Sequence, residues 1–466
     1  MNKLRSNCLN FMELLAQNIA LISPTMTAAL IVPLMFATIG NVSWLGYALG
    51  TVMLLFVAFS LNQFARRTTN SGSMYSYASS GLGFTGGALC GWCLVWAYLF
   101  IGLAGTTGFT IFAGKLLAAV HITLPPVLLF AICLGTCFFM AYKDIRISTL
   151  IMLAFEAFSC FFILLLVMIV LGYHHFAIDT TQFSFKGVSP LSLGMGVVVA
   201  IFSLVGFESS TAFGEEAINP LKTIPRSIIW SLLLTGAFFV LVSYTEVLGT
   251  RGYTTTLDQI DAPLNVLATM YHVPFLWPLL SAGAMFSFFA LASSCMNAGA
   301  RVMFAMGRHD FFPNSTSAAH KTHGTPHVAL ATMASVMFSV VTICYFVLVH
   351  NGMAVLDEFN DAGTMGAMGF TGSYILITLA APSFLKKRGE LKSKDVGLCV
   401  AAMVLLFIPT AGLVYPVPPA PVNAFPYVFG AYLFIGYVRI MAMQHQKPAR
   451  VEEITDEIKK LHAQTA

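Results

Sequence analysis

Long apolar stretches separated by short polar breaks run through the whole chain. Each is about 20 residues or longer, the length that a helix needs to cross a bilayer. They cover roughly residues 11–39, 43–64, 84–115, 124–142, 147–173, 189–213, 226–249, 275–305, 326–350, 357–382, 396–415 and 422–443. The pattern predicts an all-α integral membrane protein with twelve transmembrane helices and with both termini on one side.

The composition agrees with a protein that lies in a lipid bilayer. Hydrophobic residues make up 57% of the chain and charged residues 9%, with a mean hydropathy of +0.80, whereas soluble domains carry about 25% charged residues. The 24 Lys and Arg against 20 Asp and Glu leave too small a basic excess for a nucleic-acid surface. The nine cysteines lie mostly in apolar runs, which favours packing over disulfides. The first apolar run is long enough to span, so the N-terminus is expected to be retained.

Basic residues predict the orientation. Only Lys115, Lys186 and Arg251 fall on the side opposite to the termini, and Lys and Arg concentrate in cytoplasmic loops. The sequence therefore predicts a plasma (inner) membrane protein with cytoplasmic N- and C-termini. Residues 1–466 are expected to form a single transmembrane domain, ending in a cytoplasmic tail at 444–466 that is a short solvated helix or disordered.

Two spans contain residues that interrupt a helix at a similar depth. Pro24 in the first span removes a backbone donor and clashes with the preceding turn. In the sixth span, Gly206 is followed by Glu208 and two serines, which weaken the helix. An ionised glutamate at mid-membrane costs at least about 2.5 kcal/mol. Glu208 is therefore expected to face a cavity or a partner.

The spacing of the two breaks indicates an internal repeat. They lie five spans apart, so the two broken helices are predicted to run in opposite directions. This is the pattern of an inverted repeat of five plus five helices. The first repeat would cover residues 1–173, the second residues 189–382, and two accessory helices would follow at 396–443.

Such breaks offer binding groups for both charged ends of an amino acid. Backbone amides at the start of a half-helix suit a carboxylate, and carbonyls at the end of one suit an ammonium group. The hydroxyls of Ser23, Thr25 and Thr27 either add hydrogen bonds to the ligand or bond back to their own helix. Phe202 is expected to cover the ligand.

Four segments resemble the amino acid–polyamine–organocation transporters, in the order and spacing of that family. The longest match is Phe202–Arg226, which contains Gly206-Phe-Glu208 and Gly214-Glu-Glu-Ala-Ile-Asn-Pro220 and is similar to the family's sixth helix and following loop. Asn297–Arg308, Gly363–Phe370 and Ser71–Tyr77 match as well, the last as the loop entering the third helix.

The resemblance implies a LeuT-like fold that works by alternating access, with the first and sixth helices broken. It implies that Phe202 occludes the substrate and that carbonyls of Ser203 and Val205 lie near the substrate amine. The implied substrate site also includes Ser23, Thr25, Met26, Thr27 and Gly206. The first span departs from the family, because many relatives have a Gly-Ser/Thr-Gly turn where this chain has Ser23-Pro-Thr-Met-Thr27. Which amides meet a carboxylate is therefore left open.

Two glutamates are candidates for proton coupling. Glu208 matches a glutamate associated with proton sensing in agmatine-type antiporters of the family. Glu156 lies where some relatives have a lysine thought to replace a sodium ion, and it either titrates or braces neighbouring helices. Near the cytoplasmic end an ion network or gate latch is expected rather than substrate contact, formed by Glu215, Glu216, Arg226 and Arg301.

The sequence thus predicts a secondary active amino acid permease, working by proton-coupled symport or exchange. The alternative is a polyamine or organic amine transporter of the same family. No metal or nucleophile constellation indicates an enzyme, and no cofactor or metal is expected. No sizeable signalling domain indicates a receptor. The partners expected are the amino acid or amine, the proton and the bilayer, with no nucleic acid; the oligomeric state is left open.

Overall fold

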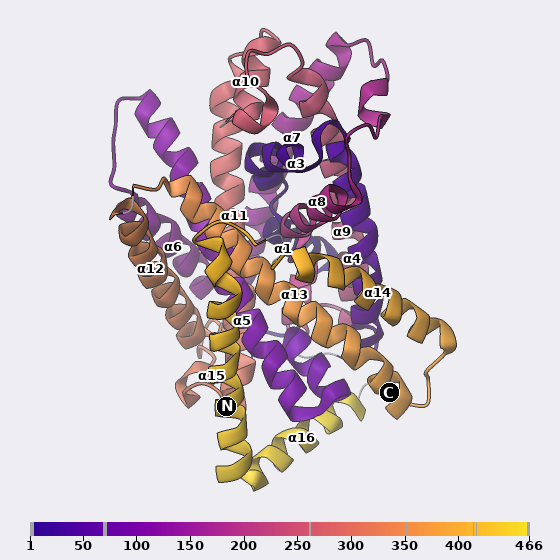
Figure 1. Cartoon of the computed structure of the whole chain (residues 1–466). Coiled ribbons are helices and arrows are strands. Elements are labelled where there is room, and N and C mark those ends of the chain that lie inside the picture. Colours follow the sequence, from indigo (N-terminus) through magenta and orange to yellow (C-terminus); the bar gives the residue numbers. More distant parts are fainter. Residues whose placement is uncertain are drawn as a thin grey trace.

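The computed structural model describes residues 4–68, 72–260, 262–350, 352–412, 414–415 and 417–463. Within these residues the chain is helical and contains no strand, only an isolated bridge between Leu9 and Ala217. The helices are α1 (Phe11–Ile22), α2 (Pro24–Met26), η1 (Thr27–Ile31), α3 (Val32–Ile39), η2 (Gly40–Val42), α4 (Ser43–Ala65), α5 (Ser73–Ala119), α6 (Pro126–Lys143), α7 (Ile145–Tyr173), η3 (Thr180–Phe183), α8 (Pro190–Leu204), η4 (Ser209–Phe213), α9 (Pro220–Gly249), η5 (Leu257–Gln259), α10 (Pro263–Met270), α11 (Leu276–Arg308), η6 (Asn314–Ser317), α12 (His327–His350), α13 (Val355–Lys387), α14 (Ser393–Gly412), η7 (Val422–Ala424), α15 (Phe425–Gln446) and α16 (Pro448–Ala463). The predicted all-α class is confirmed (Figure 1).

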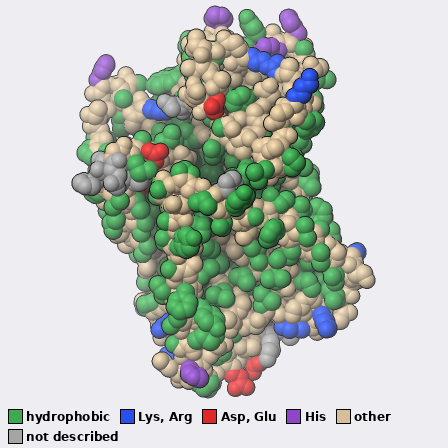
Figure 2. Space-filling model, in the orientation of Figure 1, with side chains coloured by type: hydrophobic (Ala, Val, Ile, Leu, Met, Phe, Trp, Pro, Cys, Tyr) green, Lys and Arg blue, Asp and Glu red, His purple; other side chains and the backbone are tan. Residues whose placement is uncertain are grey.

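Eleven stretches of the described residues are long and apolar enough to cross a membrane. The first, Phe11–Ala65, has 55 residues, far more than one crossing needs, and Gly40 in its left-handed backbone conformation (φ 64°) interrupts it before α4. The exact count of twelve stays a prediction. Figure 2 shows a broad hydrophobic belt, with Lys and Arg mostly towards the two ends of the visible face.

The longest helices form a scaffold through the middle of the molecule. Helix α5 packs closely against α13 and α11, and small residues allow this. A Cβ on Gly366 of α13 would lie 2.5 Å from the Ile101 side chain of α5, and one on Gly369 would lie 2.7 Å from the Cys93 carbonyl. Helix α5 begins earlier than expected, at Ser73, and bends at Gly83 (φ 79°). Ser73–Tyr77 is therefore helix and not a loop, while Ser71 lies outside the described residues.

The two broken spans lie side by side and run in opposite directions. Helix α1, the first half of the first span, packs against η4, the second half of the sixth. Helix α3, the second half of the first span, packs against α8, the first half of the sixth. The first half of each span therefore packs against the second half of the other, as expected for neighbouring spans that run in opposite directions. The predicted pair of broken helices is confirmed.

The C-terminal tail forms a helix, one of the two predicted alternatives, and docks one side of it on the rest of the molecule while residues such as Glu452 stay exposed. In α16, Ile454 is fully buried, and the Arg450 guanidinium donates to Asp310 Oδ2 at 3.2 Å and to the Arg308 carbonyl at 3.0 Å. Arg308 is the last residue of α11 and Asp310 lies just beyond it. Helix α16 lies at the lower end of the molecule in Figure 1. Residues 464–466 of the predicted tail lie outside the described part of the chain.

Candidate functional site

Ser23 interrupts the first span. It ends α1 in a left-handed conformation (φ 51°, ψ 77°), and Pro24 is the first residue of the next helical segment. Proline suits this position because it has no N–H to leave unpaired. A π-helical turn follows at Thr27–Ile31 before the α-helix resumes. The proline therefore starts a half-helix, instead of breaking one from within as the sequence suggested.

The hydroxyls at this break bond to the scaffold. Ser23 Oγ lies 2.9 Å from Ser287 Oγ of α11, and Thr25 Oγ1 is hydrogen-bonded to Ser159 Oγ of α7. Thr27 Oγ1 is buried and has no hydrogen-bond partner among the described residues. Of the two arrangements left open for these hydroxyls, bonding back within the helix does not apply to Ser23 or Thr25.

Glu156 is connected to the first break through Ser287. The Ser287 hydroxyl donates to Glu156 Oε1 at 2.8 Å, while Oε2 is buried without a partner in the described structure. A hydroxyl carries one proton, so Ser287 accepts from Ser23 when it donates to Glu156. Glu156, Ser287 and Ser23 thus form one hydrogen-bonded chain.

The sixth span breaks at Val205 and Gly206. Val205 is extended (φ −60°, ψ 150°) and Gly206 has φ 96°. A Cβ on Gly206 would lie 1.7 Å from Leu21 Cδ2 of α1, so both the backbone conformation and the close approach require glycine. The last carbonyls of α8, including those of Ser203 and Val205, lie next to this break and cannot all find partners within the helix.

Glu208 is tied to the scaffold by Tyr374 of α13. The Tyr374 hydroxyl donates to Glu208 Oε2 at 2.6 Å and accepts from the Gly206 N–H at 3.3 Å. Glu208 is fully buried, and its Oε1 has no partner among the described residues. Sequence reasoning did not identify Tyr374 as the partner, because nothing local connects residues so far apart in the chain.

Phe202 lies just before the sixth break and packs among other aromatic rings. The Phe202 ring lies 6.3 Å from that of Phe359, which lies 5.7 Å from Phe288 in an edge-to-face contact. Gly363 makes room for the first ring, since a Cβ there would lie 2.1 Å from Phe202 Cζ. Phe202 is therefore held against α13 by a close fit.

A buried ion pair joins the loop after the sixth span to α11. Arg301 Nη2 donates to Glu216 Oε1 at 2.8 Å, Arg301 Nε donates to Oε2, and both side chains are at most 1% exposed. The guanidinium also donates to the Asn297 carbonyl at 2.9 Å and lies 4.3 Å from the centre of the Phe213 ring. Breaking such a pair would leave an uncompensated buried charge.

The segment before α1, residues 5–10, closes over this ion pair, and we call it the N-terminal strap. The N–H groups of Cys8 and Leu9 donate to the Glu216 carbonyl at 2.8 and 3.1 Å, and the Ile218 N–H donates to the Leu9 carbonyl at 2.8 Å. Burial raises the pKa of the Cys8 thiol to about 11, with Glu216 adding to the shift. The thiol is therefore neutral here.

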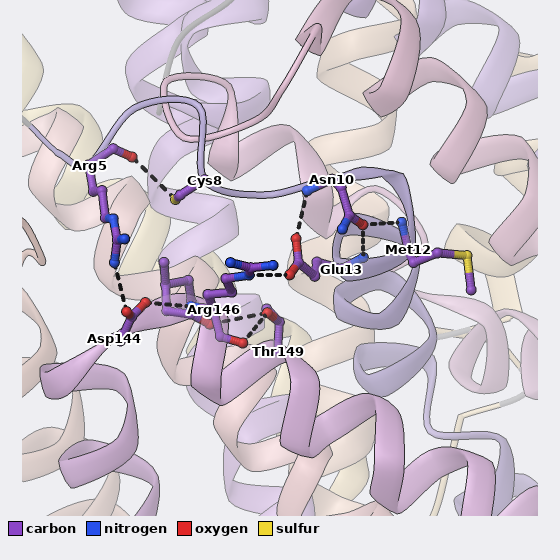
Figure 3. Close-up of polar contacts among 9 residues, drawn as sticks. Arg5, Cys8, Asn10, Met12, Glu13, Asp144, Arg146 and Thr149 are labelled. Carbon is purple, nitrogen blue, oxygen red and sulfur yellow. Dashed lines mark hydrogen bonds and ion pairs between the residues drawn. The ribbon is translucent and has the colours of Figure 1, made fainter.

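Charged pairs anchor the strap and the first turn of α1 to the start of α7 (Figure 3). Arg5 Nη1 donates to Asp144 Oδ2 at 2.7 Å, and Arg146 Nε donates to Glu13 Oε1 at 2.9 Å. Asn10 and Glu13 form a capping box at the start of α1, with Asn10 N–H to Glu13 Oε2 at 2.7 Å. Glu13 thus caps the start of α1 with one oxygen and pairs with Arg146 of α7 through the other.

The other members of the predicted ion network are placed differently. Glu215 Oε1 accepts from Arg308 Nη1 at 3.2 Å near the end of α11. Arg226 is exposed and makes no ion pair in the described part of the chain. The structure therefore brings Glu215 and Glu216 to two arginines of α11 and leaves Arg226 outside.

Sequence reasoning missed a further buried carboxylate, Glu246 of α9. It is 1% exposed, and neither oxygen has a hydrogen-bond partner among the described residues. The rule that singled out Glu208, a carboxylate within an apolar span, would have found it. Among the same residues, no group of three or more His, Cys, Asp or Glu could hold a metal ion.

A pair of antiparallel broken spans against long scaffold helices defines the LeuT-type transporter fold. A substrate-bound Na+-coupled sialic acid symporter superposes with a TM-score of 0.53 at 12% identity, covering 87% of this chain and 90% of that one. A manganese transporter variant of Eremococcus coleocola gives 0.58 at 11% identity, covering 95% and 94%. Identities this low show the fold alone.

Residues 14–438 match the family model described as amino acid permease, and the chain belongs to this family. The branched-chain amino acid permease BcaP of Bacillus subtilis is 23% identical over 374 residues, 74% of each chain. The low-affinity putrescine importer PlaP of Escherichia coli K12 is 25% identical over 305 residues, 60% of this chain and 64% of that one. The protein is thus a multi-pass membrane transporter of amino acids or amines.

Proposed function

We propose that this protein is a proton-coupled amino acid permease that works by alternating access, by symport or exchange, in the plasma (inner) membrane with cytoplasmic termini. The observation that carries the proposal is the meeting of the two breaks. Gly206 packs directly on Leu21 of α1, and each break is tied to the scaffold beside a buried carboxylate.

The substrate would lie between the two breaks. The half-helix beginning at Pro24 offers the Thr25 N–H to a carboxylate, beside Met26 and Thr27, whose own N–H groups bond to the Ser23 and Pro24 carbonyls. The carbonyls that end α8 suit an ammonium group. Phe202 would cover the bound amino acid, because it lies just before the break and its ring is held against α13 by its fit to Gly363.

Protons would reach the breaks through Glu156 and Glu208. Each has one oxygen bonded to a scaffold hydroxyl and one without a partner among the residues that the structure describes. When Glu156 is ionised, its carboxylate accepts a hydrogen bond from the Ser287 hydroxyl. When Glu156 is protonated, it no longer requires a donor, and the Ser287 hydroxyl is free to donate to Ser23 instead. Protonation would therefore change how the first break is held, which links proton binding to substrate binding.

Alternation would require the strap and the Glu216–Arg301 pair to move. Both close the same end of the broken spans, and the strap bonds directly to the Glu216 carbonyl. Because Glu216 lies on the loop and Arg301 on the scaffold helix α11, moving the loop away from α11 would separate the pair, whereas the backbone bonds of the strap can open while the pair stays closed. Opening would then release the weaker backbone bonds of Cys8 and Leu9 first.

A polyamine or organic amine transporter is the second candidate. The match to a putrescine importer favours it. Glu208 Oε1, which has no partner in the described part of the chain, also favours it because this oxygen could bind an ammonium group directly. A diamine has no carboxylate for the amides after Ser23. Competition therefore separates the two functions.

Uptake into proteoliposomes made with the purified protein tests the proposal. Radiolabelled leucine and putrescine would be offered with an inward proton gradient and without sodium. We expect leucine uptake that collapses when an ionophore removes the gradient. Uptake of putrescine alone would support the second candidate, and leucine uptake that ignores the gradient would contradict proton coupling.

A further inference from the structure

A pocket of about 430 Å³ opens beside the N-terminal strap. Three separate segments line it: the strap with Arg5, the α6–α7 junction with Lys143 and Asp144, and the loop before α12. The loop contributes His320, Lys321, Thr322, His323 and Gly324. The transport site proposed above uses none of these residues.

The pocket carries an excess of positive charge. Asp144 is its only carboxylate, and both oxygens are engaged, Oδ2 with Arg5 at 2.7 Å and Oδ1 with the Arg146 N–H at 2.9 Å. Neither Lys143 nor Lys321 makes an ion pair in the part of the chain that the structure describes. Two uncompensated ammonium groups at one hollow attract an anion.

Hydrogen bonds shape the loop that forms one wall. His320 Nδ1 accepts from the N–H groups of Thr322 and His323 at 3.3 and 3.2 Å, and its Nε2 lies 3.0 Å from the Tyr142 hydroxyl. The His320 and His323 rings stack with centroids 4.7 Å apart. Because Nδ1 accepts twice, the neutral ring carries its proton on Nε2. The pocket is thus preformed around a fixed imidazole.

Another wall lies where a lipid headgroup can reach it. Lys143 Nζ lies 4.5 Å from the centre of the Phe139 ring on α6, and Phe139 is 55% exposed on this apolar helix. An exposed ring on a spanning helix faces lipid tails, and a lysine at the end of that helix extends to the interface. A soluble anion would not require this placement.

We propose that this pocket binds the phosphate of an anionic phospholipid headgroup and thereby holds the N-terminal strap closed. Arg5, Lys143 and Lys321 come from the three lining segments, so one phosphate contacting them joins all three. The Arg5 N–H already donates to the Gly324 carbonyl at 3.2 Å. A bound headgroup would add charge-assisted hydrogen bonds to this contact.

Binding is tested on the detergent-purified protein with short-chain phosphatidylglycerol, short-chain phosphatidylcholine and inorganic phosphate in separate thermal-shift titrations. We expect a saturable stabilisation by phosphatidylglycerol only. The variant Lys143→Gln/Lys321→Gln should need at least about fivefold more lipid for half the effect, since charge-assisted contacts are lost. The control Lys392→Gln/Lys394→Gln removes two exposed lysines elsewhere and should bind like the wild type.

Hydrogen exchange at residues 5–9 gives a second readout, which phosphatidylglycerol should slow in the wild type and not in the pocket variant. Equal stabilisation by phosphatidylcholine, or equal losses in the pocket and control variants, would overturn the proposal. If inorganic phosphate gives a saturable stabilisation and the lipid adds nothing to it, the proposal that a lipid headgroup occupies the pocket would be wrong. None of these measurements uses transport, so their failure and that of the proposed function are distinguishable.

Discussion

The breaks in the first and sixth spans are held in different ways. Ser23 is a non-glycine residue in a left-handed conformation, and hydroxyl bonds to α11 and α7 secure its segment. Gly206 is secured by steric fit against Leu21 and by the Tyr374 hydroxyl. Hydroxyls can exchange partners when a ligand or proton arrives, whereas a steric fit cannot. The first break is therefore expected to respond, and the sixth to serve as the fixed reference.

Gly206→Ala should have the largest effect, because it removes the fixed reference. An L-residue in the left-handed region costs about 1–2 kcal/mol and overpacking about 1–3 kcal/mol more. We expect a lower melting temperature and loss of uptake, measured by thermal shift and in proteoliposomes. The control Gly135→Ala meets nothing within 4 Å and should behave like the wild type. Normal uptake by Gly206→Ala would mean that the sixth span is not fixed at this residue.

Gly363→Ala should act on the cover of the sixth break. The added methyl group would lie 2.1 Å from Phe202 Cζ, closer than two carbon atoms can approach, so the ring must turn away. We expect the KM for substrate to rise by about tenfold, equivalent to 1.4 kcal/mol, with a smaller change in melting temperature. The additional substitution Phe202→Leu should restore part of the stability but not the affinity. An unchanged KM in Gly363→Ala would remove Phe202 from the substrate site.

Glu208→Gln should separate a structural role from a titrating one. The glutamine carbonyl can still accept from Tyr374, so folding is expected to survive. If this carboxylate carries the proton, uptake against external pH should become flat. Glu452→Gln, an exposed substitution in α16, is the matched control and should keep the wild-type profile. A wild-type profile in Glu208→Gln would leave Glu156 as the candidate.

Ser287→Ala should have the smallest effect of the four and tests the responsive break. It removes the link between Glu156 and Ser23, which leaves Glu156 Oε1 without a donor and the Ser23 hydroxyl without an acceptor, at a cost of about 1–3 kcal/mol. We expect a few-fold drop in uptake and a shifted pH midpoint. Ser281→Ala on the same helix loses only a 3.4 Å contact with Asn265 and should leave the midpoint in place. Equal midpoints in both variants would contradict the hydrogen-bonded chain.

The sequence was sufficient for features that depend on local chemistry. Apolar run lengths predicted the spans, and Gly206 with Glu208 and the two serines after it predicted the sixth break because these residues weaken a helix. Run length did not predict where α5 begins, because the helix starts at Ser73, before the apolar run that was expected to form it. At the first break the sequence pointed to the proline, but Ser23 takes the unusual conformation and Pro24 starts the next segment.

Features that depend on tertiary contacts were beyond local reasoning. Tyr374 reaches Glu208 from a helix 166 positions later, and Ser287 reaches Glu156 across 131. Helices buried on most sides have little amphipathic pattern, so periodicity does not say which faces meet. The docking of α16 was missed for a different reason. Its many charges indicate a solvated helix, yet Arg450 uses its charge to bind the end of α11.

The π-helical turn at Thr27–Ile31 changes the rotational phase of the first span. A π turn holds one residue more than an α turn, and an α-helix advances about 100° per residue. The buried face of α3, which includes Val32 and Met35, therefore points about 100° away from where an uninterrupted helix would aim it. Removing one residue from the turn would rotate that face off α8. The two halves of this span are thus rotated independently about the helix axis, because the turn that joins them can hold one residue more or one residue fewer.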